Sequence, residues 1–126
     1  MYKPEGYNSL SPYLIVGDAQ VLLDFLKAVF GAEPFFVHRD EGGEMSHIEI
    51  RIDDTVLMIG QMPGAVSEAH VHVYVPDVDE AFARAREAGG TVVQEPVRKA
   101  DADRRGGIAD PTGTVWWLAT QQEPRG

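Results

Sequence analysis

The sequence predicts an α+β fold made of two tandem β-α-β-β-β modules, which form a curved mixed sheet with a half-barrel cleft and helices on the outer face. An alternating apolar pattern that ends in a Val-x-Asp step occurs at Ser11–Asp18 and again at His70–Asp77, 59 residues further on (77 − 18 = 59). The same separation relates Gly31 to Gly90, and each glycine follows a helical pattern. These repeats indicate two equivalent halves, about residues 10–61 and 69–120, within a single domain that spans residues 1–126.

Each half contains one amphipathic helix. In both helices, apolar side chains recur at i, i+3, i+4 and i+7. The two stripes are Leu22, Phe25, Leu26 and Val29, then Val78, Ala81, Phe82 and Ala85. We expect Asp18 and Asp77 to cap the N-termini, because their carboxylates can accept bonds from free helix N–H groups. Gly31 and the pair Gly89–Gly90 are expected to end the helices.

Three strands are predicted after each helix. In the first half they are Glu33–Arg39, Glu44–Ile52 and Thr55–Gln61; in the second, Thr91–Val97, a short strand near Gly107–Ala109, and Thr114–Thr120. Lys99–Gly106 is predicted to be a charged loop, and Asp110–Gly113 a tight turn. The rival fold is a ferredoxin-like βαββαβ domain, which has two strands between its helices. Three strand-like runs between Gly31 and Asp77 favour the repeated plan.

The composition excludes several classes of partner. The chain has 126 residues, a formal net charge of −9 and no cysteine. Its basic residues are scattered rather than gathered in a stripe, which argues against nucleic acid and anionic membranes. The lack of cysteine excludes disulfides, thiolate metal sites and cysteine nucleophiles. The lack of cysteine also fits a cytoplasmic protein, which is the compartment we expect. No apolar run is long enough to span a bilayer, and we expect no membrane partner.

Strand alternation assigns side chains to two faces of the sheet. In the strand that begins at His70, three valines point to one face, which suits packing under the helices. His70, His72 and Tyr74 point to the other face. The equivalent strand of the first half presents Tyr13 there. Trp116 and Trp117 must point to opposite faces, so one is expected in the core and the other on the concave side.

Six motifs, distributed along nearly the whole chain, resemble one known family. They are Pro12–Asp18, Phe25–Glu33, Ser46–Ile52, His70–Asp79, Asp103–Gly107 and Asp110–Gly113. Together they resemble the glyoxalase/bleomycin-resistance/dioxygenase group, or vicinal oxygen chelate superfamily. Within it they are most similar to the branch of small glyoxalase-like proteins found beside phosphonate-utilisation genes. Because the superfamily contains lyases, dioxygenases, epimerases and drug-sequestering proteins, the resemblance implies a fold but not one reaction.

The resemblance also implies four positions for metal ligands, two from each module, usually His, Glu or Gln. In this sequence they fall on Ser11, Met58, His70 and Trp117. Only His70 is a competent ligand, since a thioether is poorly matched to a hard cation and an indole does not coordinate. A catalytic metal normally has about three protein ligands. We therefore predict no metal and no other cofactor; a shifted ligand set using His72, Gln61 or Glu49 is the alternative.

The predicted function is small-molecule binding without the usual catalytic metal. The resemblance implies a homodimer, in which two open half-barrels pair. The clefts are predicted to be lined by Tyr13, Met58, His70, His72, Tyr74 and Trp117. No catalytic residue is assigned. The alternatives are a divalent-metal-dependent lyase or dioxygenase with non-standard ligands, and a dimeric structural or regulatory partner without a ligand.

Three side-chain pairs allow two interpretations each. His70 and His72 are either a metal pair or the polar lining of a pocket. His47 and Glu49 share a strand face, so they are either a general acid/base couple or a polar pair on a half-exposed sheet. Arg104–Arg105 is either a clamp for a carboxylate or phosphate, or part of a solvated loop.

Overall fold

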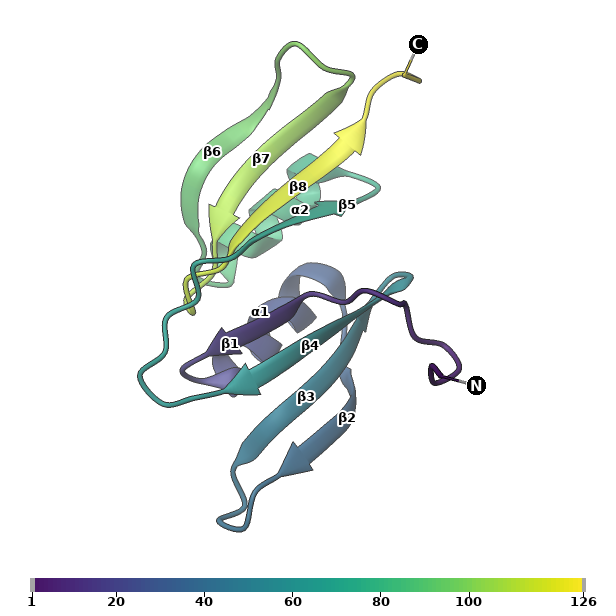
Figure 1. The fold of residues 1–126 in the computed structure, drawn as a ribbon. Helices are drawn as coiled ribbons and strands as arrows, with labels where there is room; N and C mark the ends of the chain where they lie inside the picture. The colour runs from purple at the N-terminus through teal and green to yellow at the C-terminus, as the bar shows by residue number, and fades with distance from the viewer. Residues whose placement is uncertain (1, 126) are drawn as a thin grey trace.

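The computed structural model describes residues 2–125 and consists of two β-α-β-β-β modules (Figure 1). The first module contains β1 (Tyr13–Val16), α1 (Ala19–Phe30), β2 (Pro34–Arg39), β3 (Met45–Ile52) and β4 (Thr55–Gln61). The second contains β5 (His70–Tyr74), α2 (Val78–Glu87), β6 (Thr91–Arg98), β7 (Asp103–Ala109) and β8 (Val115–Gln121). The predicted fold class is therefore confirmed.

The two modules have the same strand connectivity. Each forms a four-stranded mixed sheet, with the order β1-β4-β3-β2 in the first and β5-β8-β7-β6 in the second. The opening strand of each module pairs in parallel with the last strand, and the other pairs are antiparallel. This register places Tyr13 opposite Met58, and His72 opposite Trp117. Four of the predicted pocket residues thus form two cross-strand pairs.

The predicted caps hold both helices. The Asp18 carboxylate accepts hydrogen bonds from the backbone N–H groups of Gln20 and Val21, at 3.0 and 3.3 Å. Gly31 ends α1 in the left-handed region, with a φ of 66°. In α2, the Asp77 carboxylate accepts a bond from the Glu80 N–H at 3.2 Å, and Gly89 follows the helix with a φ of 98°. Each helix therefore begins and ends where the sequence indicates.

One apolar core joins the modules. α1 and α2 lie side by side where the modules meet (Figure 1). The rings of Phe30 and Trp116 lie 5.7 Å apart, and Arg84 of α2 donates to the carbonyl of Val29 at 3.0 Å. Trp116 is fully buried, so it is the core tryptophan of the predicted pair. The helix-facing sides of both sheets share this core, which leaves the opposite face of each sheet open.

The prediction of a charged loop at Lys99–Gly106 was wrong for its second half. β7 begins at Asp103, where Arg105 pairs with Ala119 of β8 and with Val97 of β6. A charged strand is stable here because its polar side chains are bonded to one another on the open face, as described below. Among residues 2–125, no helix is both long and apolar enough to cross a membrane.

Candidate functional site

The open face of the second sheet carries an imidazole–indole pair. The indole Nε1 of Trp117 donates a hydrogen bond to Nδ1 of His70 at 3.0 Å, and the two rings are nearly parallel, at 12° with centroids 6.3 Å apart. Gly107 lies beneath the indole: a Cβ added there would be 2.5 Å from the ring. Because Nδ1 accepts a bond in this pair, a neutral His70 carries its proton on Nε2.

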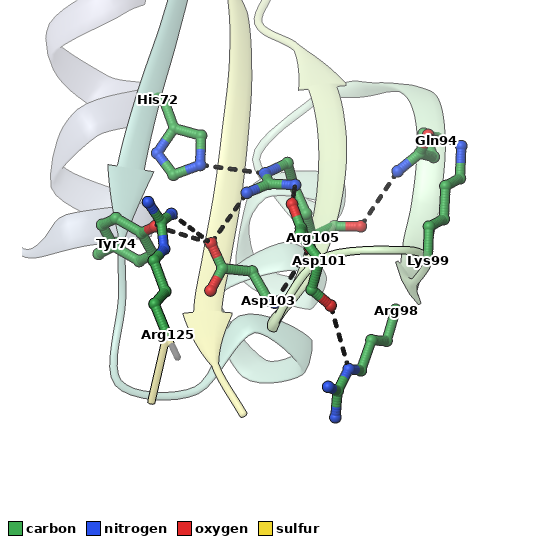
Figure 2. A network of polar contacts seen from close by, with 9 residues as sticks. All are labelled: His72, Tyr74, Gln94, Arg98, Lys99, Asp101, Asp103, Arg105 and Arg125. Atoms are coloured by element: carbon green, nitrogen blue, oxygen red, sulfur yellow. Dashed lines mark hydrogen bonds and ion pairs between the residues drawn. The ribbon is translucent and has the colours of Figure 1, made fainter. Parts of the chain in front are cut away.

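A network of charged side chains lies beside this pair on the same face (Figure 2). Arg105 is at its centre. Its guanidinium donates to Nε2 of His72 at 3.0 Å, and to the carboxylates of Asp101 and Asp103 at 2.9 Å each. Tyr74 donates its phenol proton to Asp103 at 2.7 Å. These bonds connect β5, β7 and the loop before β7.

The tail of the chain closes the network. Arg125 donates to the phenol oxygen of Tyr74 at 2.9 Å and lies 3.6 Å from the carboxylate of Asp103. Asp103 is only 1% exposed, and its Oδ1 has no hydrogen-bond partner among the described residues. Figure 2 shows Arg105 and Arg125 on two sides of this carboxylate. The two guanidinium groups compensate the buried charge of Asp103.

His72 is held neutral in this network. Burial of its ring, and next the positive charge of Arg105, lower the pKa of His72 below its ordinary value of 6.5. A guanidinium can only donate, so Nε2 of His72 uses its lone pair to accept from Arg105, and the proton sits on Nδ1. His72 therefore offers an N–H donor at Nδ1 rather than a free lone pair for a metal.

The open face of the first sheet is different in character. Tyr13 lies over Gly60, where an added Cβ would be 2.9 Å from the phenol oxygen. Tyr13 also meets His47 edge to face, with ring centroids 5.8 Å apart. Tyr13 is 56% exposed, so its ring is available to a ligand. Met58 of β4 lies between two neighbours in adjacent strands: it is paired with Tyr13 of β1 and with Glu49 of β3.

A buried carboxylate is the polar centre of the first open face. Glu49 is 8% exposed and accepts hydrogen bonds from the phenol of Tyr7 and from Nε2 of His47, the latter at 2.8 Å. Burial by itself would raise the pKa of Glu49, but the bonds from Tyr7 and His47 outweigh it and hold the pKa below the ordinary value. The bond to Glu49 in turn raises the pKa of the Tyr7 phenol.

Two aromatic side chains pack against the residues that hold this carboxylate. A register shift in β2 lies between Pro34 and Phe36. Phe35 contacts the ring of Tyr7, with centroids 6.0 Å apart, and Phe36 contacts the ring of His47 at 6.2 Å. Because a bulge opposes two residues of one strand to one of its partner, successive side chains can reach the same cluster. Phe35 and Phe36 remain 43% and 46% exposed.

The predicted pocket residues form two separate groups. Tyr13 and Met58 lie on the first open face; His70, His72, Tyr74 and Trp117 lie on the second. None of the ring contacts or hydrogen bonds among residues 2–125 joins the two groups. Two hollows lie between the modules, one of about 910 Å³ and one of about 330 Å³. Of the six predicted residues, only Tyr74 lines the larger hollow. His72 and Tyr74 line the smaller one.

Several polar residues of these faces were not among the predicted pocket residues. Tyr7 lies in an irregular segment rich in Pro and Gly, so periodicity gives no signal for it. Asp103 and Arg105 lie in a stretch that was predicted as a loop, because Asp103–Gly107 contains no apolar side chain whose alternation would indicate a strand. Of the pair Arg104–Arg105, Arg104 lies on the opposite face of β7 and pairs with Asp79 of α2 at 2.9 Å, whereas Arg105 lies on the open face.

Comparison with known proteins identifies the family. The model of the Glyoxalase/Bleomycin resistance protein/Dioxygenase superfamily matches residues 7–118. The chain belongs to this superfamily. It is 34% identical over 123 residues to the uncharacterized protein Rv0887c of Mycobacterium tuberculosis, covering 87% of this chain and 72% of that protein. It is equally similar to the uncharacterized protein Mb0911c of Mycobacterium bovis, covering 87% of this chain and 81% of that protein.

Several solved structures have the same fold as this chain. TioX from a Micromonospora species superposes with a TM-score of 0.73 at 23% identity, covering 94% of this chain and 100% of that chain. A glyoxalase/bleomycin resistance protein from Catenulispora acidiphila gives a TM-score of 0.66 at 22% identity, with 88% and 96% covered. A gene product of Arabidopsis thaliana gives 0.69 at 20% identity, with 90% and 98% covered. These similarities support the fold alone.

The residues at the metal positions of the superfamily do not fit a divalent cation. Ser11 offers a buried hydroxyl, Met58 a thioether, and Trp117 an N–H donor. The fourth residue, His70, has its Nδ1 lone pair engaged by Trp117. Among residues 2–125, no group of three or more His, Cys, Asp or Glu side chains is spaced to hold a metal ion.

The alternative ligands are also engaged elsewhere. Gln61 accepts a bond from the backbone N–H of Ala19, at the start of α1, through its side-chain oxygen at 2.8 Å. Glu49 is held by Tyr7 and His47, and His72 by Arg105. A shifted ligand set would have to break these bonds first.

Proposed function

We propose that this superfamily member binds a small, partly aromatic molecule on its open sheet faces without a catalytic metal. The observation that supports this most strongly is the bond between Trp117 and His70, because it joins two of the four metal positions to each other. The pair turns a coordination site into a hydrogen-bonding site, in which the Nε2–H of His70 faces a ligand as a donor.

The chemistry of the ligand follows from the exposed rings and donors. Tyr13 and Tyr74 are 56% and 53% exposed, so their rings offer apolar faces for a planar group to stack on. The N–H groups of His70 and His72 would bind acceptor oxygens or nitrogens of the same molecule. We therefore expect a ligand with an aromatic ring and at least one carbonyl, carboxylate or similar acceptor.

A homodimer is part of the proposal. The two groups of pocket residues do not meet within one chain, and both open faces expose aromatic side chains to solvent. Pairing of the first open face with the second face of another copy would bring the groups together and cover these rings. We also propose that the protein is cytoplasmic and that it belongs to the branch of small glyoxalase-like proteins found beside phosphonate-utilisation genes.

Metal analysis of untagged protein tests the central claim. We expect Zn, Ni, Mn and Fe far below one atom per chain, and no rise in melting temperature when these ions are added. Trp117→Phe, which breaks the bond to His70, should leave both results unchanged. Light scattering should give twice the chain mass of 13.8 kDa.

The opposite result would favour the second candidate function. A metal bound at one atom per chain, whose removal abolishes a lyase or dioxygenase activity, would identify a metalloenzyme with non-standard ligands. A crystal structure of the protein as purified would then show density for the ion beside His70 and Trp117.

A further inference from the structure

The first open face holds a carboxylate–imidazole couple that the binding function does not use. The ionised carboxylate of Glu49 can only accept, so the 2.8 Å contact requires that Nε2 of His47 carries the proton. The Nδ1 of His47 then keeps its lone pair. Among the hydrogen bonds formed by residues 2–125, none uses this atom.

The imidazole is held in place from three sides. Tyr13 and Phe36 meet its ring edge to face, at 5.8 and 6.2 Å between centroids, and Glu49 holds its Nε2. Tyr7 binds the second oxygen of the Glu49 carboxylate, which fixes the orientation of that group. The His47 side chain remains 29% exposed, so a ligand on this face can reach it.

A histidine with a buried carboxylate on one nitrogen and an open lone pair on the other has the arrangement of a general base. The carboxylate fixes the tautomer and stabilises the imidazolium that forms when the ring accepts a proton. The exposed rings of Tyr13, Phe35 and Phe36 supply a surface on which a planar molecule can stack beside the base.

We propose that His47 accepts a proton from a planar aromatic carbon acid bound on the first open face, with Glu49 as its positioning residue. In this step a C–H bond of the ligand breaks, the proton joins Nδ1, and the electron pair stays on the ligand or expels a leaving group. The imidazolium later returns the proton to the product or to water. This activity goes beyond binding, and it can fail while metal-free binding holds.

The base can be tested without the natural ligand by using 5-nitrobenzisoxazole as a probe. Loss of its ring C–H proton to a base breaks the N–O bond and gives a coloured cyanonitrophenolate. Metal-stripped wild-type protein should release this product faster than free imidazole at the same concentration. His47→Gln should lower the rate by about 100-fold, the lower range for a general base.

Two further variants separate the role of each residue. Glu49→Gln should reduce the rate by about 10-fold, since it keeps an acceptor for Nε2 but removes the charge. His38→Gln is the matched control: His38 lies opposite His47 on β2, is exposed, and should give the wild-type rate. Circular dichroism of each variant verifies that it is folded.

A second measurement tests the geometry independently of activity. Nitrogen-15 NMR of the wild-type imidazole rings should show His47 with a proton on Nε2 and none on Nδ1. The proposal is overturned if His47 carries its proton on Nδ1, if His47→Gln reacts as fast as wild type, or if wild type is no faster than imidazole. Metal analysis is unaffected by any of these results, so failure here is distinguishable from failure of the binding function.

Discussion

At the scale of single residues, hydrogen-bond donors decide what each histidine can do. Trp117 engages Nδ1 of His70, and Arg105 engages Nε2 of His72. Both histidines were predicted from strand alternation to point to the open face, but their tautomers depend on partners from other strands. The sequence therefore located the rings, while only the folded chain assigns one N–H group to each.

The lowered pKa of His72 predicts how stability depends on pH. In the unfolded chain the ring takes up a proton as the pH falls through 6.5, whereas in the folded chain it stays neutral to lower pH. The unfolded state then binds more protons, so the free energy of unfolding decreases as the pH falls below 6.5. His72→Gln should make this decrease shallower. Chemical denaturation at neutral and mildly acidic pH measures it, and equal slopes for both proteins would contradict the assignment.

At the scale of elements, all strands were predicted close to their observed bounds except the charged first part of β7. Only one orientation suits the apolar stripes of α1 and α2 and the valines of β5, because these side chains must face the core. β7 was predicted as a loop over Asp103–Gly106 because its charges resemble a solvated segment. In the folded chain β7 is paired on both sides, by β6 and β8, and Asp103 is bonded to Tyr74 and lies beside Arg125, both distant in sequence, so no local pattern records these partners.

Gly107 illustrates how two neighbouring strands fit together. An added Cβ would be 2.5 Å from the indole of Trp117, so Gly107→Ala should displace the ring and break its bond to His70. We expect a loss of about 1–3 kcal/mol in the free energy of unfolding. The shift of the Trp117 indole N–H in NMR spectra should change as well.

Gly42→Ala is the control for this change. Within 4 Å of a Cβ at Gly42 lies only the Asp40 carboxylate, at 3.4 Å, so stability should change by less than about 0.5 kcal/mol. If Gly107→Ala were equally neutral and kept the indole signal, the indole could not rest over Gly107.

At the scale of the whole molecule, the two modules depend on one core. The contact between Phe30 and Trp116 and the bond from Arg84 to Val29 cross the boundary between them. The repeat in the sequence predicted two equivalent modules, but not which surfaces join them. Equivalent halves can meet through helices or through sheet edges. In this protein they meet through α1 and α2, whose side chains pack against each other.

The shared core predicts a single cooperative transition. Both tryptophans lie in β8, so their fluorescence reports the second module and, through the contact of Trp116 with Phe30, its boundary with the first. Far-ultraviolet circular dichroism reports both modules. Denaturation curves from the two probes should coincide. Phe30→Ala should lower the free energy of unfolding by about 2 kcal/mol and shift both curves together. A fluorescence midpoint that differs from the dichroism midpoint would show that the modules unfold independently.

The chemical difference between the two open faces has a consequence for ligand stoichiometry. A twofold dimer that joins unlike faces contains two identical clefts, so a titration would show two equivalent sites and one dissociation constant. A dimer that joins like faces contains one cleft rich in phenyl rings and another rich in guanidinium groups. The same titration would then resolve two unequal affinities, and its shape would reveal the mode of assembly without a crystal.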